Sequence, residues 1–162
     1  ETTSAGNNIA SAHPTVLFAL GHTRAALKRW SGSAEAYVAA AASEPNPHQR
    51  ARCFTGAGIA YANIPGDLAL TLGAENLKAA LSLGVEDVEF IVNTMLTLAA
   101  VHKSAGDLEA AMEVLQRCVE FAPEVRERFI EPLQKEMDNK AAGKGEITTG
   151  ETITAGRKSK KL

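Results

Sequence analysis

The chain has 162 residues and a formal net charge of −2, and hydrophobic residues make up 45% of it. These values are typical of one soluble globular domain with room for short tails. Only 5% of the residues are aromatic, whereas alanine is by far the most frequent residue. Alanine favours helices and lets two helix backbones approach closely, while β-sandwiches and barrels depend on β-branched and aromatic residues. The composition therefore predicts an all-α fold and excludes an all-β fold.

The charge is unevenly placed along the chain. Residues 140–162 hold six lysines or arginines against two glutamates, which gives this tail a charge of +4 and leaves −6 on the rest. A nucleic-acid-binding domain instead concentrates its basic residues on a folded face. We therefore expect an acidic folded body with a basic tail. The tail residues that are candidates for contact with RNA or an acidic protein are Arg157, Lys158, Lys160 and Lys161.

The predicted elements are helices that follow one another from Pro14 to about Asn139. They cover 14 to about 30, 34–43, 48–63, 68–82, 87–103 and 108 to about 122. Prolines end the second and sixth of them, because proline has no amide hydrogen to continue a helix. Asp67 and Asp107 each follow a glycine and are predicted to cap the next helix. The two Gly-Asp turns lie forty residues apart, which indicates a repeated helix–turn–helix unit.

Small residues recur where paired helices would cross. They are Gly21, Gly58 and Ala99 in the first helices of the three pairs, and Ser33, Gly73 and Ala111 in the second helices. When two helices pack closely, one presents a small residue where a large group of its partner needs room. The Gly56-Ala57-Gly58 segment has the same explanation, because a dinucleotide-binding loop would need a strand before it.

Several of these residues resemble a tetratricopeptide repeat. Leu20-Gly21, Tyr37, Ala40 and Pro45 fall at the repeat's positions in residues 14–47. In residues 92–125 the matching residues are Leu98-Ala99, Gly106-Asp107, Ala111, Leu115 and Pro123, and the middle unit matches after an insertion of about three residues near Pro65. The resemblance implies a right-handed α–α superhelix of about three helix pairs with a C-terminal capping helix.

The capping helix is predicted from an apolar stripe at Val125, Phe129, Leu133 and Met137. Such a stripe can cover the last repeat, or it can form an amphipathic surface for another protein. Pro132 lies inside the pattern and predicts a break near Glu131. We thus expect an N-terminal extension at 1–13, a helical-repeat domain at 14–139, and an extended basic tail at 140–162 with too little apolar content to fold alone.

The sequence offers no pattern for catalysis, a metal or a cofactor. Cys53 and Cys118 lie far apart and are predicted to be buried apolar side chains. The four histidines, His13, His22, His48 and His102, show no metal-ligand spacing. The longest apolar stretch, residues 90–101, is too short for a membrane span.

In a tetratricopeptide array the first helices line a concave groove that binds partners. By resemblance, the groove residues are Phe18, His22, Thr55, Ile59, Asn63, Asn93, Leu96, Ala100 and Lys103. The chaperone-binding members of the family hold a carboxylate with lysine, asparagine and arginine, but the corresponding places here hold Phe18, His22, Thr55, Asn93 and Thr97. The groove is instead suited to a helix or extended segment with few charges.

We therefore expect a non-catalytic scaffold or accessory subunit that contacts other protein subunits of a larger complex. One alternative is an adaptor or assembly factor that binds peptides transiently. Another is an RNA-associated helical-repeat subunit that uses the basic tail. The first residue is Glu1 rather than methionine, which is compatible with a chloroplast or mitochondrial precursor after presequence removal, with a trimmed chain and with a cytoplasmic protein.

Overall fold

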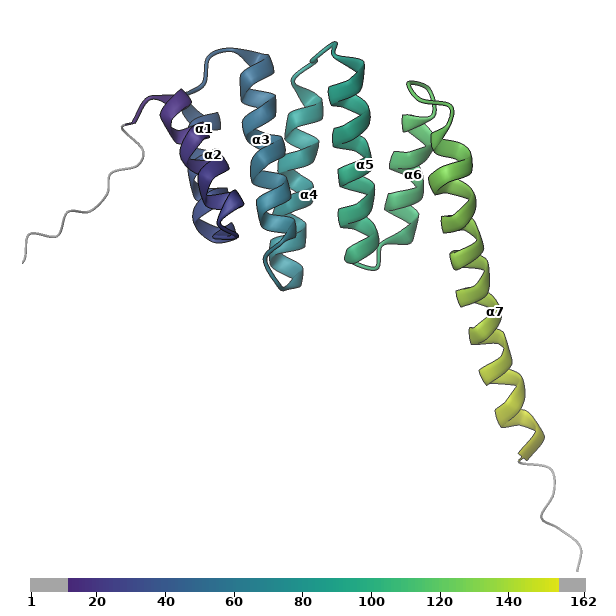
Figure 1. Ribbon diagram of the computed structural model, residues 1–162. Coiled ribbons are helices and arrows are strands. Elements are labelled where there is room, and N and C mark those ends of the chain that lie inside the picture. The colour runs from purple at the N-terminus through teal and green to yellow at the C-terminus, as the bar shows by residue number, and fades with distance from the viewer. Residues whose placement is uncertain (1–11, 155–162) are drawn as a thin grey trace, which may run out of the picture.

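The computed structural model describes residues 12–154, with side chains described as far as Gly143. This part of the chain is all-α and contains no strand (Figure 1). Its helices are α1 (Pro14–Ala26), α2 (Trp30–Ser43), α3 (Pro47–Ala62), α4 (Asp67–Ser82), α5 (Val88–Ser104), α6 (Leu108–Cys118) and α7 (Glu131–Thr154), and a π-helical turn, η2 (Arg126–Ile130), comes directly before α7. The predicted fold class is confirmed.

The helices form a row of neighbouring pairs in two layers. Each of the first six helices packs against the next one in the chain, and α1 and α5 also contact α3 across the row. The helices α1, α3 and α5 therefore form one layer, and α2, α4 and α6 form the other (Figure 1). This arrangement is a helical-repeat fold, because each unit buries its apolar surface against its neighbours in the row.

Small residues are the points of closest approach between helices, as predicted. A Cβ atom on Gly58 would lie 3.0 Å from the backbone oxygen of Gly73, and one on Gly73 would lie 3.0 Å from that of Gly58. The ring of Tyr37 on α2 packs against Gly21 of α1 and against Gly56 of α3. The Ser33 hydroxyl donates a hydrogen bond of 2.8 Å to the Gly21 carbonyl oxygen. These contacts fix how the helices of the first two pairs are aligned along one another.

Some predicted helix ends differ from the structure. The carboxylate of Asp107 accepts a hydrogen bond from the Ala110 amide at 3.0 Å, so this residue caps α6 as predicted. Asp67 was expected to cap α4 in the same way, but that expectation is wrong: the N-cap is Gly66 at φ 112°, and Asp67 is the first helical residue. The first helix also ends earlier than predicted, and Trp30 begins α2.

The C-terminal helix covers the last pair, with a change of register at its start. The side chains of Val125 and Leu133 are buried in the cluster formed by α5 and α6. The predicted break near Glu131 is a π-helical turn, in which the Glu131 amide donates to the Arg126 carbonyl oxygen. The turn inserts an extra residue, so Ile130 packs on the cluster while Phe129 remains 37% exposed.

The helical part of the chain extends further than the sequence suggested. An extended tail was expected from Lys140 onward, but α7 continues to Thr154 and runs past the end of the array (Figure 1). The segment 140–154 contains no proline, and it follows a helix that has already nucleated, so further turns form despite its glycines and threonines. The predicted N-terminal extension, apart from its last two residues, lies outside the described residues.

Candidate functional site

Eight of the nine predicted groove residues lie on α1, α3 and α5, and the ninth, Asn63, is the C-cap residue directly after α3. Six of them, His22, Ile59, Asn63, Asn93, Ala100 and Lys103, are exposed, whereas Phe18, Thr55 and Leu96 are half-buried. The structure therefore presents most of this set to solvent on one layer. It does not bring the whole set into a single cavity: Leu96, Ala100 and Lys103 share a pocket, and Phe18 lines a separate one beside Glu44 and Gln49.

At the α1 end, the side chains of this set mostly pack against the array itself. Phe18 meets the Tyr37 ring edge to face, with 5.4 Å between the ring centroids. The Arg52 guanidinium lies 6.0 Å from the centre of the Phe18 ring. At the end of α3, the side-chain amide of Asn63 donates to the Ile59 carbonyl oxygen at 2.8 Å. Phe18 and Asn63 are thus partly satisfied within the array, which leaves Ile59, 41% exposed, as the main apolar contact point there.

At the other end, the array forms an apolar pocket of about 200 Å³, which we call the α5–α7 pocket. Its lining consists of Leu96, Ala99, Ala100, Lys103, Ala111, Leu115, Arg128, Phe129, Pro132 and Leu133. Most of these side chains are aliphatic or aromatic, and the two cations belong to residues with exposed side chains. The pocket can therefore enclose one large apolar side chain beside two positive charges.

The two cations of the α5–α7 pocket are held in different ways. Lys103 forms an ion pair with Glu136 of α7, with 2.8 Å between its Nζ and the nearer carboxylate oxygen. The hydrogen bond from Lys103 lowers the pKa of the Glu136 carboxyl, and Lys140, 3.5 Å away, acts in the same direction. Arg128 instead lies over the ring of Phe129, 5.6 Å from its centre. Lys103 thus links α5 to α7, while Arg128 forms no ion pair with the described residues.

The sequence reasoning missed half of the α5–α7 pocket. It identified Leu96, Ala100 and Lys103 from the family pattern. It assigned Phe129 and Leu133 to a stripe that covers the last repeat or forms an amphipathic surface for another protein, and not to the groove. The stripe assumed a regular helix, whereas the π-helical turn rotates Phe129 away from the cluster and into the lining of the pocket. Pro132 was the available signal, because a proline within an apolar stripe indicates a local departure from α-helical geometry.

The two thiols are placed for packing. Cys53 and Cys118 are buried and unpaired, as predicted. Burial, with a smaller contribution from Glu44, raises the pKa of the Cys53 thiol to about 11. Burial also raises the pKa of Cys118. Both side chains are therefore protonated at neutral pH, and a protonated thiol is a poor nucleophile and a poor metal ligand.

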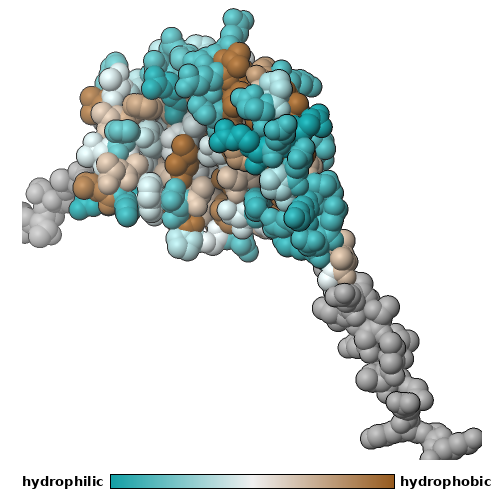
Figure 2. Space-filling model, turned by 45° about the vertical axis from the view of Figure 1, so that its right-hand side comes forward, coloured by the Kyte–Doolittle hydropathy of each residue, from teal (hydrophilic) through white to brown (hydrophobic). Residues whose placement is uncertain are grey.

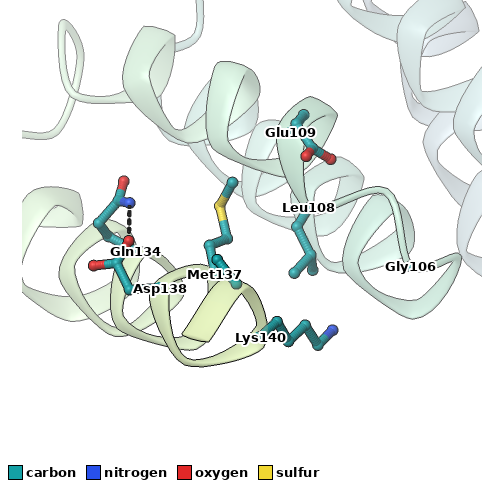
Figure 3. Close-up of a pocket in the computed structure, with 8 residues that line it drawn as sticks. Gly106, Leu108, Glu109, Gln134, Met137, Asp138 and Lys140 are labelled. Carbon is teal, nitrogen blue, oxygen red and sulfur yellow. Dashed lines mark hydrogen bonds between the residues drawn. The ribbon is translucent and has the colours of Figure 1, made fainter. Parts of the chain in front are cut away.

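A second depression lies where α7 leaves the array (Figure 3). It is a cleft of about 630 Å³ between the start of α6 and the first half of α7. Leu108 and Met137 lie across it from one another, and the Gln134 amide donates to the Asp138 carboxylate at 2.9 Å (Figure 3). Glu109, Asp138 and Lys140 give the cleft a mixed charge, so its chemistry is less selective than that of the α5–α7 pocket.

The outer face visible in Figure 2 has a mixed character. On the face shown in Figure 2, hydrophobic residues form small separate patches among hydrophilic ones. Within residues 12–154, no helix is long and apolar enough to cross a membrane. The described side chains contain no group of three or more histidine, cysteine, aspartate or glutamate residues that could hold a metal ion. Arg157, Lys158, Lys160 and Lys161, the predicted tail contacts, lie outside the described residues.

Comparison with known proteins gives no family assignment. No family model matches the chain, and no curated protein matches it.

Proposed function

We propose that this protein is a non-catalytic scaffold or accessory subunit, which binds a segment of another protein along the layer formed by α1, α3 and α5. The observation that carries this proposal is the α5–α7 pocket. It is apolar, has a volume of about 200 Å³, and contains three residues that the sequence had assigned to a partner-binding groove: Leu96, Ala100 and Lys103. An anchor for a partner is the simplest use of such a pocket.

The pocket has the properties of an anchoring site. Burying one large apolar side chain contributes about 1.5–3 kcal/mol, and residues that insert into such pockets supply much of the binding energy of protein interfaces. Phe129 is 37% exposed at one side of the pocket, and Ile59, further along the layer, is 41% exposed. A helix or extended segment could place one apolar side chain against each of them.

The positive charges of the layer define the partner further. Arg52 lies over Phe18, and Arg128 lies over Phe129, so a cation adjoins the aromatic residue at each end. Neither arginine forms an ion pair within the described part of the chain. A partner segment with apolar anchors and one or more acidic residues matches this surface. The similarity to tetratricopeptide repeats, which is part of the proposal, supports the choice of this layer as the binding face.

The test uses size-exclusion chromatography of the native extract to compare two matched variants of the whole chain. Ala100→Arg places a long charged side chain in the mouth of the pocket, while Ala42→Arg places the same side chain at an exposed position on α2, in the other layer. We expect the wild type and Ala42→Arg to elute in an assembly larger than the 17.1 kDa chain and Ala100→Arg to elute alone. Retention of Ala100→Arg in the assembly would contradict the proposal.

The alternative functions make different predictions in the same experiment. A transient adaptor would elute alone at low concentration and would join its partner only when the partner is added. The RNA alternative depends on the tail, and a contact with phosphates would weaken steeply as the salt concentration rises. An apolar anchor in the α5–α7 pocket would show little dependence on salt.

A further inference from the structure

A cleft on the opposite layer of the array has a composition that packing does not explain. It lies between α4 and α6, with α5 as its floor, and its volume is about 340 Å³. Its apolar residues are Leu81, Leu98, Ala110 and Val114, and its polar residues are Lys78, Ser82, His102, Glu113 and Arg117. The cleft is separate from the groove layer, because two of its three walls are helices of the second layer. We call it the α4–α6 cleft.

His102 is the unusual side chain in this cleft. The residue is only 9% exposed, yet its ring forms no hydrogen bond with any other described residue. The nearest carboxylate oxygen belongs to Asp107 and lies 4.0 Å from the ring Nδ1, which is beyond hydrogen-bond distance. The ring nitrogens are not fully enclosed, because the fully buried side-chain atoms that lack a partner in the described part of the chain belong to Thr55 and Thr94. The ring therefore retains a donor and an acceptor for a ligand in the cleft.

Two cations belong to opposite walls of the cleft. Lys78 lies on α4 and Arg117 lies on α6, and neither forms an ion pair within the part of the chain that the structure describes. Burial, with a smaller contribution from Lys78, lowers the pKa of His102. Glu113 is the one acidic residue of the lining. With a neutral histidine, the cleft therefore carries a net charge of +1.

We propose that the α4–α6 cleft binds a monovalent carboxylate attached to a short apolar group. The carboxylate lies between Lys78 and Arg117 and accepts a hydrogen bond from His102, and the apolar group covers Leu81 and Val114. The shape favours a small group, because 340 Å³ is near the lower limit for ligand sites. Glu113 disfavours ions with two or more negative charges, since it would repel the additional charge.

This chemistry has two possible sources, a free small carboxylic acid and a glutamate within an apolar segment of another protein. Butanoate is the probe for the first source. An acetylated and amidated Leu-Glu-Leu peptide is the probe for the second. Butanamide and the corresponding Leu-Gln-Leu peptide are the uncharged controls, and inorganic phosphate tests the preference for a single charge.

The experiment follows the ring signals of the full-length protein by NMR, with the His102 signal assigned from a His102→Gln variant. We expect butanoate or the glutamate peptide to shift the His102 signal saturably and to raise its pKa, because a bound anion favours the imidazolium form. Asp107 and Glu113 on α6 and Lys78 on α4 also influence this ring. For this reason the pKa is compared with and without ligand in the same protein.

Variants identify the residues that bind. Loss of a hydrogen bond to a charged group weakens binding about tenfold or more. Lys78→Ala combined with Arg117→Ala should produce at least this loss, and Lys135→Ala combined with Arg126→Ala, which removes two exposed cations elsewhere, should produce none. Saturation by butanoate alone assigns the site to a free acid, and tighter binding of the peptide assigns it to a partner protein. The proposal is overturned if neither probe shifts the signal, if the uncharged controls shift it equally, or if the Lys78 and Arg117 variant binds as the wild type does.

Binding of a carboxylate in the α4–α6 cleft is independent of the proposed scaffold function. Ala100→Arg blocks the α5–α7 pocket in the other layer and should leave the response of His102 unchanged.

Discussion

A substitution at the contact between Gly58 and Gly73 is the strongest test of how α3 and α4 pack against each other. In Gly58→Ala, the new Cβ would lie 2.6 Å from the Leu77 Cγ and 3.0 Å from the Gly73 carbonyl oxygen. Neither atom can move freely, because the Leu77 side chain is fully buried and the oxygen belongs to the α4 backbone. Overpacking costs about 1–3 kcal/mol, and two fixed contacts this short place the cost at about 2–3 kcal/mol. The better helix propensity of alanine offsets about 1 kcal/mol of that cost.

We expect Gly58→Ala to lower the free energy of unfolding by about 1–2 kcal/mol, which corresponds to a melting temperature roughly 2–8 °C lower for a chain of this size. Thermal denaturation followed by circular dichroism at 222 nm measures this shift. Gly143→Ala is the matched control, because a Cβ at this helical position on α7 has no atom within 4 Å. A Gly58→Ala protein that melts at or above the wild-type temperature would refute the close approach of α3 and α4.

Three further changes test other contacts. Asp107→Ala removes the cap of α6 and should lower the free energy of unfolding, measured by urea denaturation, by about 1 kcal/mol. Asp67→Ala should have a smaller effect, because Asp67 caps no helix. Equal effects would contradict the assignment of the caps. Because burial and Lys78 lower the pKa of His102, the folded state binds fewer protons than the unfolded state, so stability should decrease as the pH falls below about 6.5. His102→Gln should reduce this dependence. If the stability of this variant depends on pH as that of the wild type does, His102 is not the group responsible. Ala111→Phe should overpack α5 against α6 and cost about 1–3 kcal/mol in the same assay, whereas wild-type stability would show that the pair has room for the ring.

The fold was accessible from the sequence because its determinants are local. Prolines and glycines mark the helix ends, and small residues mark the contacts within pairs, as Gly58 and Gly73 illustrate. The turn before α2 was harder to place. There the chain reverses at Lys28, which has φ 56°. This left-handed conformation is uncommon for lysine, so the sequence gives no indication of it.

The candidate sites were only partly predictable, because they depend on how distant elements meet. Leu96 and Ala100 follow from the helix pattern, but the pocket also needs Phe129, whose direction is set by the π-helical turn. His102 is buried and lines the α4–α6 cleft. Its lack of a hydrogen bond and its position between Lys78 and Arg117 depend on the packing of α4 against α5 and α6, which no local pattern encodes.

The central claim is that the layer formed by α1, α3 and α5 binds another protein through the α5–α7 pocket. Site-specific photocrosslinking in the native extract tests it most directly, with the reactive residue placed at Ala100 or at Leu68. Leu68 lies on α4 in the other layer and is 74% exposed. The account predicts a discrete crosslinked protein from Ala100 and none from Leu68. Equal crosslinking from both positions, or none from Ala100, would contradict it.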